Sequence, residues 1–286
     1  MTVKEIITQE KPSLSFEVFP PKTADNFDKV KTATEQIALL KPSYMSVTYG
    51  AGGSTSKYTA EIAQNLKNNY GVTPLAHMTC VCSSPEDIHA RLDDLKSKGI
   101  ENILALRGDI PAGESMENMH YKHASELVYE IKKFGGFCIG GACYPEGHPE
   151  SENGEKDLYY LKQKADSGME FLTTQMFFDN NILYNFLYRA LKHKIDVPVI
   201  AGIMPVTSAV QIKRIMSISG TALPQRFVRI VDRFGDDPAA MKQAGIAYAT
   251  EQIIDLLANG INAIHVYSMN KPDVAAAIKE NLRHII

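Results

Sequence analysis

The chain contains 286 residues, of which 44% are hydrophobic, and its 30 Lys and Arg nearly balance its 33 Asp and Glu. This length can bury a large core, and the balanced charge argues against a polyanion-binding surface, so nucleic acid is not an expected partner. The N-terminus has no signal-peptide pattern and no run approaches the roughly eighteen apolar residues of a membrane span, which predicts a cytoplasmic protein without membrane association.

In the first half of the chain, apolar runs of strand length alternate with segments of helical periodicity. Val3, Ile6 and Ile7 are expected to pack as one helical turn ahead of the first strand. Ser84-Pro85 gives the clearest helix start, since serine caps an N-terminus and proline suits the first helical position. The predicted strands cover 14–19, 44–49, 73–81 and 102–106, and the helices after them cover about 27–40, 57–69, 85–98 and a stretch ending at 134.

A glycine-rich turn with the sequence GAGGSTS begins at Gly50, directly after the second predicted strand. Gly50, Gly52 and Gly53 do not have the GxGxxG spacing of a dinucleotide-binding turn, and the chain contains no GxxxxGK[ST] phosphate loop. The glycines are therefore interpreted as a tight bend, or as a place where the backbone approaches a ligand.

The second half of the chain continues the alternation. Ser208 is expected to cap one helix, and Asp237-Pro238 opens a long one. A stripe of apolar residues at helical spacing predicts an extra helix between Pro224 and Gly235. The predicted strands cover 137–144, 171–178, 198–204 and 261–267, and the other helices cover 157–167, a stretch ending near 193 and the C-terminal segment.

Eight strands that alternate with eight helices, without a composition break, predict a single α/β catalytic domain over 1–286, a (βα)8 TIM barrel with an extra helix between helices 7 and 8. In such barrels the active site lies at the carboxyl ends of the strands. Chemistry-bearing residues at or near predicted strand ends are Glu17, Thr48, Arg107, Asp109, Tyr144, Gln175 and Asn270. This arrangement predicts an enzyme active site at that end of the barrel.

Glu17 stands in an apolar strand, where alternation places it on the same face as Ser15. It is either a carboxylate paired with Lys or Arg, or a desolvated acid that takes part in catalysis. Arg107 and Asp109 follow the fourth predicted strand, and they either carry chemistry or form a surface ion pair that closes a turn at Gly108. The pattern around these residues leaves both interpretations open.

The four cysteines, Cys80, Cys82, Cys138 and Cys143, form no CxxC pair, which fits a reducing compartment. Cys80 and Cys82 are two residues apart and would face the same way on a strand, so they could share a metal ion. A second pair of ligands is missing, however, and small buried thiols are the favoured interpretation. No metal is therefore predicted.

Seven segments resemble those of methylenetetrahydrofolate reductases and occur in the same order: SFEVFPPK, SVTYGAGG, LALRGDIP, YPEGHPE, TTQMFFD, GIMPV and HVYSMNK. Each segment alone is modest, but together they cover essentially the whole chain. The resemblance implies a barrel that binds FAD, takes a hydride from NADH or NADPH and passes it to 5,10-methylenetetrahydrofolate, giving 5-methyltetrahydrofolate. This implied ping-pong reaction supplies methyl groups for methionine synthesis, and the resemblance to bacterial forms favours NADH.

The same resemblance implies roles for individual residues. Glu17 corresponds to the general acid that protonates the folate as its five-membered ring opens. Asp109 resembles the aspartate that contacts the pterin and favours the developing cation. Gln175, Gln211 and Lys271 fall where the family contacts folate, and Gln175 is also expected at the nicotinamide.

For FAD, the resemblance implies contacts from residues spread along the chain: Tyr49, His77, Arg107, Gly108, Asp109, Tyr144, His148, Asp157 and Lys164. Thr48 matches a contact to the nicotinamide. Arg107 and Lys164 would offset the phosphates of the cofactor. The missing GxGxxG turn is no objection, because the barrel itself can orient a flavin.

The chain departs from the family pattern at a few places. The loop after Asp109 aligns poorly, which leaves open whether Tyr121 or His123 contacts the flavin. Met176 stands where an aromatic residue is common and Lys271 where Arg also occurs, and both are expected to shift folate affinity. The chain ends with the barrel, so neither a C-terminal regulatory domain nor inhibition by S-adenosylmethionine is expected.

Two other functions fit part of the pattern. A pterin-binding methyltransferase would share a barrel and an acidic pterin contact but would need no flavin. A non-catalytic barrel subunit would have lost the acid, whereas Glu17 and Asp109 are both present. A homo-oligomer is expected from the resemblance alone.

Overall fold

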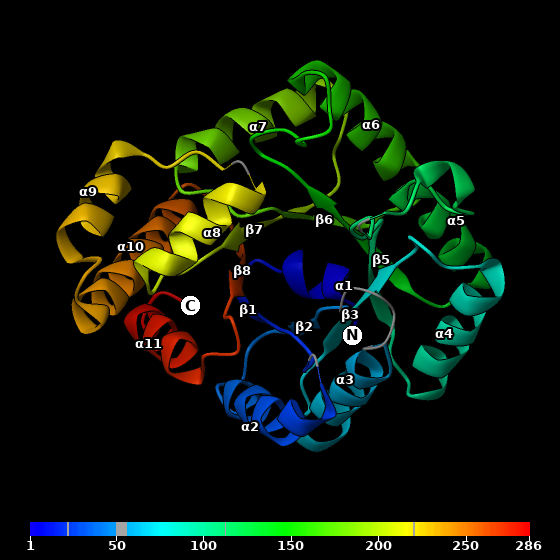
Figure 1. Ribbon diagram of the computed structural model, residues 1–286, viewed down its shortest axis with the longest axis horizontal. Helices are drawn as coiled ribbons and strands as arrows, with labels where there is room; N and C mark the ends of the chain where they lie inside the picture. Colours follow the sequence, from blue (N-terminus) through cyan, green and yellow to red (C-terminus); the bar gives the residue numbers. More distant parts are fainter. Residues whose placement is uncertain (22, 50–55, 112, 220) are drawn as a thin grey trace.

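Figure 1 shows a computed structural model of the chain, viewed into a ring of helices. The residues that it describes are 1–21, 23–49, 56–111, 113–219 and 221–286. Eight parallel strands form a closed barrel in which each strand pairs with its neighbours in the sequence and the last strand pairs with the first. The strands are β1 Ser13–Val18, β2 Met45–Val47, β3 Pro74–Thr79, β4 Asn102–Leu106, β5 Cys138–Cys143, β6 Phe171–Thr174, β7 Val199–Ile203 and β8 Ala263–Tyr267. The predicted (βα)8 barrel is therefore confirmed.

The helices surround the barrel, apart from the short first one, which lies over the centre of the ring in Figure 1. They are α1 Val3–Ile7, α2 Phe27–Ala38, α3 Ser56–Tyr70, α4 Pro85–Ser97, α5 Ala124–Phe134, α6 Gly154–Asp166, α7 Asn180–Lys192, α8 Ala209–Ser219, α9 Gln225–Phe234, α10 Pro238–Ala258 and α11 Pro272–Leu282. The predicted extra helix is α9. The predicted cap of α4 is also confirmed, because Ser84 Oγ accepts a hydrogen bond from Asp87 N at 3.1 Å.

Strand alternation sorts side chains between the inside of the barrel and the layer beneath the helices. On β1, Leu14 and Phe16 are buried in the large hydrophobic cluster that includes helix residues, as expected of a parallel sheet covered on its outer face. The alternate residues Ser15 and Glu17 lie on the inner face, where Ser15 contacts His265 of β8. The two predicted faces of this strand are therefore confirmed.

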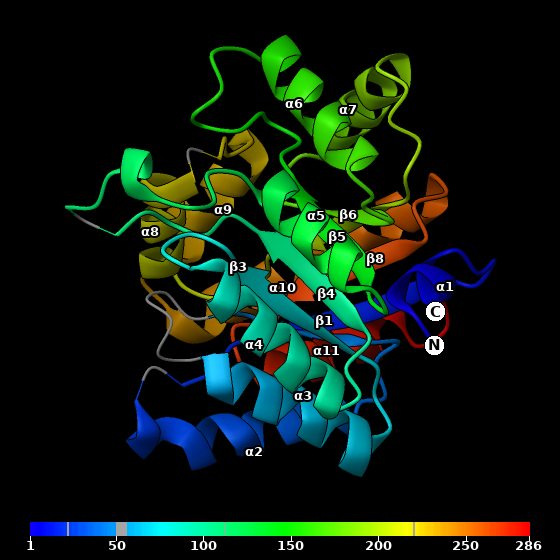
Figure 2. The same ribbon diagram turned by 90° about the vertical axis from the view of Figure 1, so that its right-hand side faces the viewer.

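The short helix α1 closes the amino-terminal end of the barrel. Its Val3, Ile6 and Ile7 are buried together with strand residues such as Leu75. The amide of Val3 also donates to Asn102 Oδ1 at 2.8 Å, which ties the helix to β4. Figure 2 shows α1 and both chain ends on one side of the barrel, with α8 and α9 toward the other side. The predicted N-terminal turn therefore plugs the end opposite the expected active site.

The helix α10 approaches the loop after β7 closely. A Cβ atom on Gly245 would lie 1.7 Å from the carbonyl oxygen of Val206, so glycine is required at this point of the helix. Nearby, Phe227 of α9 stacks on Phe178 with 5.2 Å between the ring centroids. Tyr248 of α10 donates to Phe178 O at 2.6 Å. These contacts hold both helices against the segment that follows β6.

Strand β6 is shorter than predicted, since it ends at Thr174 rather than at 178. Phe177 and Phe178 lie beyond its end and are nevertheless fully buried. The carbonyl of Phe177 accepts a hydrogen bond from Gln252 of α10 at 3.0 Å, in place of a strand partner. The apolar run that suggested a long strand thus results partly from packing against helices.

Two further details differ from the predictions. Helix α6 begins at Gly154 rather than at Asp157, because Asn153 Oδ1 caps it by accepting from two first-turn amides. Cys82 lies beyond the end of β3 with φ +56° and is exposed, whereas Cys80 is buried. The expectation that both thiols are buried is therefore wrong for Cys82.

Candidate active site

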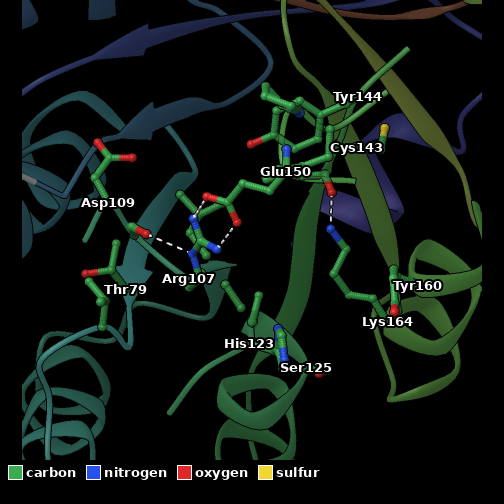
Figure 3. A pocket seen from close by; sticks show the side chains of 18 of the residues that line it. Thr79, Arg107, Asp109, His123, Ser125, Cys143, Tyr144, Glu150, Tyr160 and Lys164 are labelled. Atoms are coloured by element: carbon green, nitrogen blue, oxygen red, sulfur yellow. Dashed lines mark hydrogen bonds and ion pairs between the residues drawn. The ribbon is translucent and has the colours of Figure 1, made fainter. Parts of the chain in front are cut away.

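A cavity of about 1150 Å³ opens at the carboxyl ends of strands β3 to β6 (Figure 3). Its wall contains the end residues of these strands or the residues that follow them, for example Thr79, Leu106 and Cys143. The predicted site residues that line this cavity are Tyr49, Arg107, Gly108, Asp109, Tyr144, His148, Asp157, Lys164 and Gln175. The structure therefore brings most of the predicted flavin ligands together in one place.

The end of β4 is shaped by a glycine. Gly108 has φ +91°, and a Cβ atom there would lie 2.8 Å from Val81 Cγ1. The amide of Val81 donates to Arg107 O at 2.9 Å, so the backbone of the turn after β3 is fixed to this point. Glycine is needed because a side chain would be strained at this φ and would collide with its neighbour. This turn delivers Arg107 and Asp109 to the cavity wall.

The guanidinium of Arg107 forms a two-point ion pair with Glu150. Its Nη1 and Nη2 donate to the two carboxylate oxygens at 2.5 and 2.7 Å, while Nε donates to Gly108 O at 3.2 Å. Hydrogen bonding to Glu150 raises the pKa of Arg107, and Arg107 lowers the pKa of Glu150 in return. The alternative in which Arg107 pairs with Asp109 is therefore wrong. Asp109 is exposed and lies on the other side of Arg107 in Figure 3.

The loop after β5 supplies an aromatic pair and holds Glu150. The rings of Tyr144 and His148 meet edge to face, with their centroids 4.6 Å apart. The amide of Glu150 donates to His148 Nδ1 at 3.1 Å, which leaves Nε2 as the protonated nitrogen of the neutral ring. Desolvation lowers the pKa of His148 and raises the pKa of Tyr144, so both side chains are neutral at pH 7.

A second cation lines the cavity on α6. Lys164 is partly buried, and its Nζ donates to the carbonyl of Ala142 at the end of β5. Desolvation lowers the pKa of Lys164. Desolvation also raises the pKa of the neighbouring Cys143 thiol to about 12. Asp157, also on α6, accepts from Ser151 Oγ at 3.2 Å. Arg107 and Lys164 thus bring positive charge to the cavity wall from different elements.

Inside the barrel, Glu17 lies between two histidines. Its Oε2 is 3.7 Å from His77 Nε2 and 3.9 Å from His265 Nε2, and its side chain is only 18% exposed. Burial lowers the pKa of His77 to about 4, so this ring is neutral at pH 7 and the contact is not an ion pair. His77, expected at the flavin, therefore lies beside the proposed acid and does not line the cavity.

His265 is fixed by two serines. Its Nδ1 is 2.7 Å from Ser15 Oγ, and its Nε2 is 3.0 Å from Ser46 Oγ. Ser15 Oγ also donates to Ile264 O at 3.0 Å, and in this arrangement it accepts from His265 Nδ1. The ring also stacks on Tyr44 with 5.7 Å between centroids. These contacts fix the orientation of the imidazole beside Glu17.

Gln211 and Lys271, two further predicted residues, form a third group near the ends of β7 and β8. Lys271 Nζ donates to Thr207 Oγ1 at 2.6 Å, and Thr207 N donates to Gln211 Oε1 at 3.1 Å. Thr207 therefore links the two expected folate contacts, although neither lines the cavity. Thr48 lies just after β2, where its amide donates to Val18 O at 2.9 Å. The glycine-rich turn at 50–55 lies outside the described residues.

The structure adds residues that the sequence analysis did not single out. Glu150 and Arg107 are far apart in the chain, so their pairing has no local signal, although Glu150 stands in the YPEGHPE segment. His265 had a signal, because alternation along β8 places it on the same face as Tyr267, next to the strand that carries Glu17.

Two features are absent from the described part of the chain. No group of three or more His, Cys, Asp or Glu is arranged to hold a metal ion there. No helix in those same ranges has the length and apolar character needed to cross a membrane.

Sequence comparisons place the chain among known proteins. The profile of the family described as methylenetetrahydrofolate reductase matches residues 2–283. A protein named 5,10-methylenetetrahydrofolate reductase from Escherichia coli K12 is 33% identical over 94% of this chain and 90% of its own length. Proteins named methylenetetrahydrofolate reductase (NADH) 1 from Arabidopsis thaliana and Zea mays are 34% and 35% identical over 98% and 94% of this chain. The chain spans about half the length of these plant relatives, 50% and 48%.

A comparison with solved structures supports the fold. A protein from Clostridium thermocellum, described as uncharacterized and as binding two copies of 5-methyl-5,6,7,8-tetrahydrofolic acid, superposes with a TM-score of 0.64 over the full length of both chains. Its sequence identity is 14%, so this similarity shows the shared barrel alone.

Proposed function

Because this chain belongs to the methylenetetrahydrofolate reductase family, we propose that it is an FAD-dependent enzyme that reduces 5,10-methylenetetrahydrofolate to 5-methyltetrahydrofolate. The observation that carries the proposal is the cavity of about 1150 Å³ with Arg107 and Lys164 in its wall. Pockets for drug-sized ligands measure roughly 300–1,000 Å³, so this cavity has room for a dinucleotide.

The donors in the cavity suit the proposed cofactor. Arg107 and Lys164 offer charge-assisted hydrogen bonds to two phosphates, and Arg107 has the planar fork that binds phosphate at two points. Neutral Tyr144 and His148 provide aromatic surface beside these cations. When bound, FAD supplies hydride chemistry, since it can accept a hydride from a nicotinamide and release it to an electrophilic carbon. The barrel then has to orient the ligands and exclude water.

Glu17 is the proposed general acid. Opening the methylene bridge of the folate makes a carbon electrophilic while a nitrogen takes up a proton, so a positioned acid lowers the barrier. The carboxyl group of Glu17 is largely shielded from water and has two imidazoles within 4 Å. Neutral His77 cannot act as a fixed counter-charge to the carboxylate. Exposed Asp109 is the proposed anion that favours the cationic folate species.

Substrate contacts are proposed for two of the groups described above. Gln175 lines the cavity, where it can reach folate or nicotinamide. Gln211 and Lys271, which are joined through Thr207, are proposed to bind folate outside the cavity, and Lys271 contributes a cation. Thr48 remains a proposed contact for the nicotinamide.

The reductant and the context are part of the same proposal. NADH is the proposed hydride donor, in keeping with the names of the plant relatives, and the two substrates use the site in turn in a ping-pong sequence. The product would supply methyl groups for methionine synthesis. A cytoplasmic location suits the four unpaired cysteines, and assembly of identical chains remains an expectation from the family.

An absorbance experiment tests the proposed function. The purified protein, reconstituted with FAD if necessary, should show the absorbance of oxidised flavin and should lose it under anaerobic NADH. Addition of 5,10-methylenetetrahydrofolate should then restore the oxidised spectrum, whereas tetrahydrofolate without the methylene group should not. A protein that stays colourless after reconstitution would instead fit a pterin-binding methyltransferase.

A further inference from the structure

We propose that Glu150 is an internal competitor for the cofactor: its carboxylate occupies the phosphate-binding edge of Arg107 and is displaced when the pyrophosphate of FAD binds. This inference rests on the proposed function, because it assigns Arg107 to the FAD site. It concerns which group occupies Arg107 before the cofactor binds. The two side chains face each other in Figure 3, and both line the cavity.

The donors of Arg107 show why displacement is needed. A guanidinium has five N–H groups, and a two-point contact with an anion uses one whole edge of the fork. In this structure Nη1 and Nη2 both donate to Glu150, and Nε donates to Gly108 O. The edge formed by Nε and Nη2 is therefore interrupted by the backbone carbonyl. A phosphate can gain a two-point contact only on the edge that Glu150 now holds.

Glu150 is placed so that it can leave. Its side chain is 58% exposed, whereas that of Arg107 is 21% exposed, so the carboxylate can turn toward water while the guanidinium stays in the wall. The backbone of the loop has its own supports, since Ser151 N donates to His148 O at 2.9 Å. Displacement therefore needs only a rotation of one side chain.

The exchange has a physical rationale. An unpaired Arg side chain samples many rotamers, and ordering it on binding costs free energy. The pair with Glu150 keeps the fork in one orientation before FAD arrives. The same pair must be broken on binding, and a carboxylate left near the phosphates repels them. Glu150 thus weakens the binding of FAD, but it keeps Arg107 oriented and the site occupied before the cofactor arrives.

Removal of the competing charge provides the test. We measure the Kd of FAD for apoprotein of the wild type, Glu150→Gln and Glu152→Gln by quenching of flavin fluorescence. Glu150→Gln should bind FAD at least fivefold more tightly than the wild type. Glu152→Gln is the matched control: Glu152 lines the same cavity but pairs with Lys156 at 3.1 Å, so its Kd should change less than twofold.

A variant that lacks Arg107 separates competition for this side chain from a general effect of the Glu150 charge on FAD binding. In Arg107→Met, FAD should bind more weakly, and adding Glu150→Gln should bring no further gain. Equal or weaker FAD binding by Glu150→Gln in the wild-type background, with an unchanged thermal midpoint, would overturn the inference and make Glu150 a support of Arg107. That result leaves the proposed function standing as long as wild-type protein binds FAD. If wild-type apoprotein fails to bind FAD at all, the proposed function falls and this inference with it.

Discussion

At His77, the cost of burial outweighs the attraction of a carboxylate. The side chain is 7% exposed, and removal from water favours its neutral form. The negative charge of Glu17 acts in the opposite direction, and His265 adds to the effect of burial. The net result is a pKa of about 4, so the group beside the proposed acid carries no charge at pH 7.

This low pKa predicts a pH dependence of stability. In the unfolded chain His77 titrates near its ordinary pKa of about 6.5. Between that value and about 4 the unfolded state takes up a proton that the native state does not, so the free energy of unfolding falls as the pH is lowered. From pH 7 to pH 5 the contribution of this residue amounts to about 2 kcal/mol.

Urea denaturation of the apoprotein at several pH values checks this prediction. The wild type should lose about 2 kcal/mol more stability than His77→Gln between pH 7 and pH 5, because the variant lacks the titrating group. His89→Gln serves as the control, since this histidine lies on the surface with its side chain 47% exposed. Parallel curves for the wild type and His77→Gln would show that His77 takes up its proton as readily in the native state as in the unfolded chain, which contradicts the lowered pKa.

Asp109 supports a prediction about the reaction itself. Asp109→Asn removes the charge while nearly preserving the shape, so the folate half-reaction should lose about 2 kcal/mol of transition-state stabilisation. The expected loss lies at the low end of the range for electrostatic groups in active sites, because Asp109 is exposed in this structure. Reduction of the flavin by NADH should change much less.

The measurement for Asp109 is the kcat/KM for 5,10-methylenetetrahydrofolate, with Glu114→Gln as the control. Glu114 is an exposed carboxylate that lines the same cavity, and its replacement should have little effect. If both variants reduce folate as fast as the wild type, Asp109 has no electrostatic role in the reaction.

At the scale of elements, the close approach of α10 to the loop after β7 is open to a direct test. Alanine normally stabilises a helix interior by about 1 kcal/mol relative to glycine. In Gly245→Ala the new methyl group would meet the carbonyl of Val206, and the helix would have to shift. We therefore expect a loss of stability of more than about 2 kcal/mol, opposite in sign to the propensity.

Chemical denaturation of Gly245→Ala and Gly154→Ala measures this effect. In the control, a Cβ atom on Gly154 would lie 2.7 Å from the end of the Arg189 side chain, which can move. The control should therefore stay within about 1 kcal/mol of the wild type. Equal stability of Gly245→Ala and the wild type would mean that α10 can move away from the loop at no cost.

The elements also show what a sequence can and cannot predict. The faces of β1, the cap at Ser84 and the helix α9 follow from local rules about alternation, capping and helical spacing, and the structure confirms them. The end of β6 could not be predicted, because Phe177 and Phe178 are buried by helices that come much later in the chain. Local patterns report that a residue is buried but not which partner buries it.

The candidate site follows the same division. Residues at strand ends, such as Arg107 and Tyr144, were predicted to converge because the closed barrel brings those ends together, and they do line one cavity. The pairing of Arg107 with Glu150 depends on the path of a loop and has no short-range signal. The location of His77 beside Glu17 likewise depends on the register of three strands, because β2 pairs with β1 on one side and with β3 on the other.

For the molecule as a whole, closure of the barrel creates two adjoining environments. The cavity is open to solvent, and its wall carries cations that suit phosphates. The barrel interior beside it is largely buried and holds one carboxyl group between two imidazoles. This separation suits an enzyme in which hydride transfer and protonation of the substrate depend on different groups of residues. Glu17 is therefore expected to matter for only one of the two half-reactions.

Stopped-flow absorbance of flavin bound to Glu17→Gln tests this claim most directly. Reduction by NADH requires no proton donor at the folate and should stay within a few-fold of the wild-type rate. Reoxidation by 5,10-methylenetetrahydrofolate should slow by at least 10² to 10⁴, the range typical of a lost general acid, because Gln cannot supply the proton. If both half-reactions slow together, Glu17 holds the barrel or the flavin in place; if neither slows, the proton comes from another group, and the assignment of Glu17 as the acid is wrong.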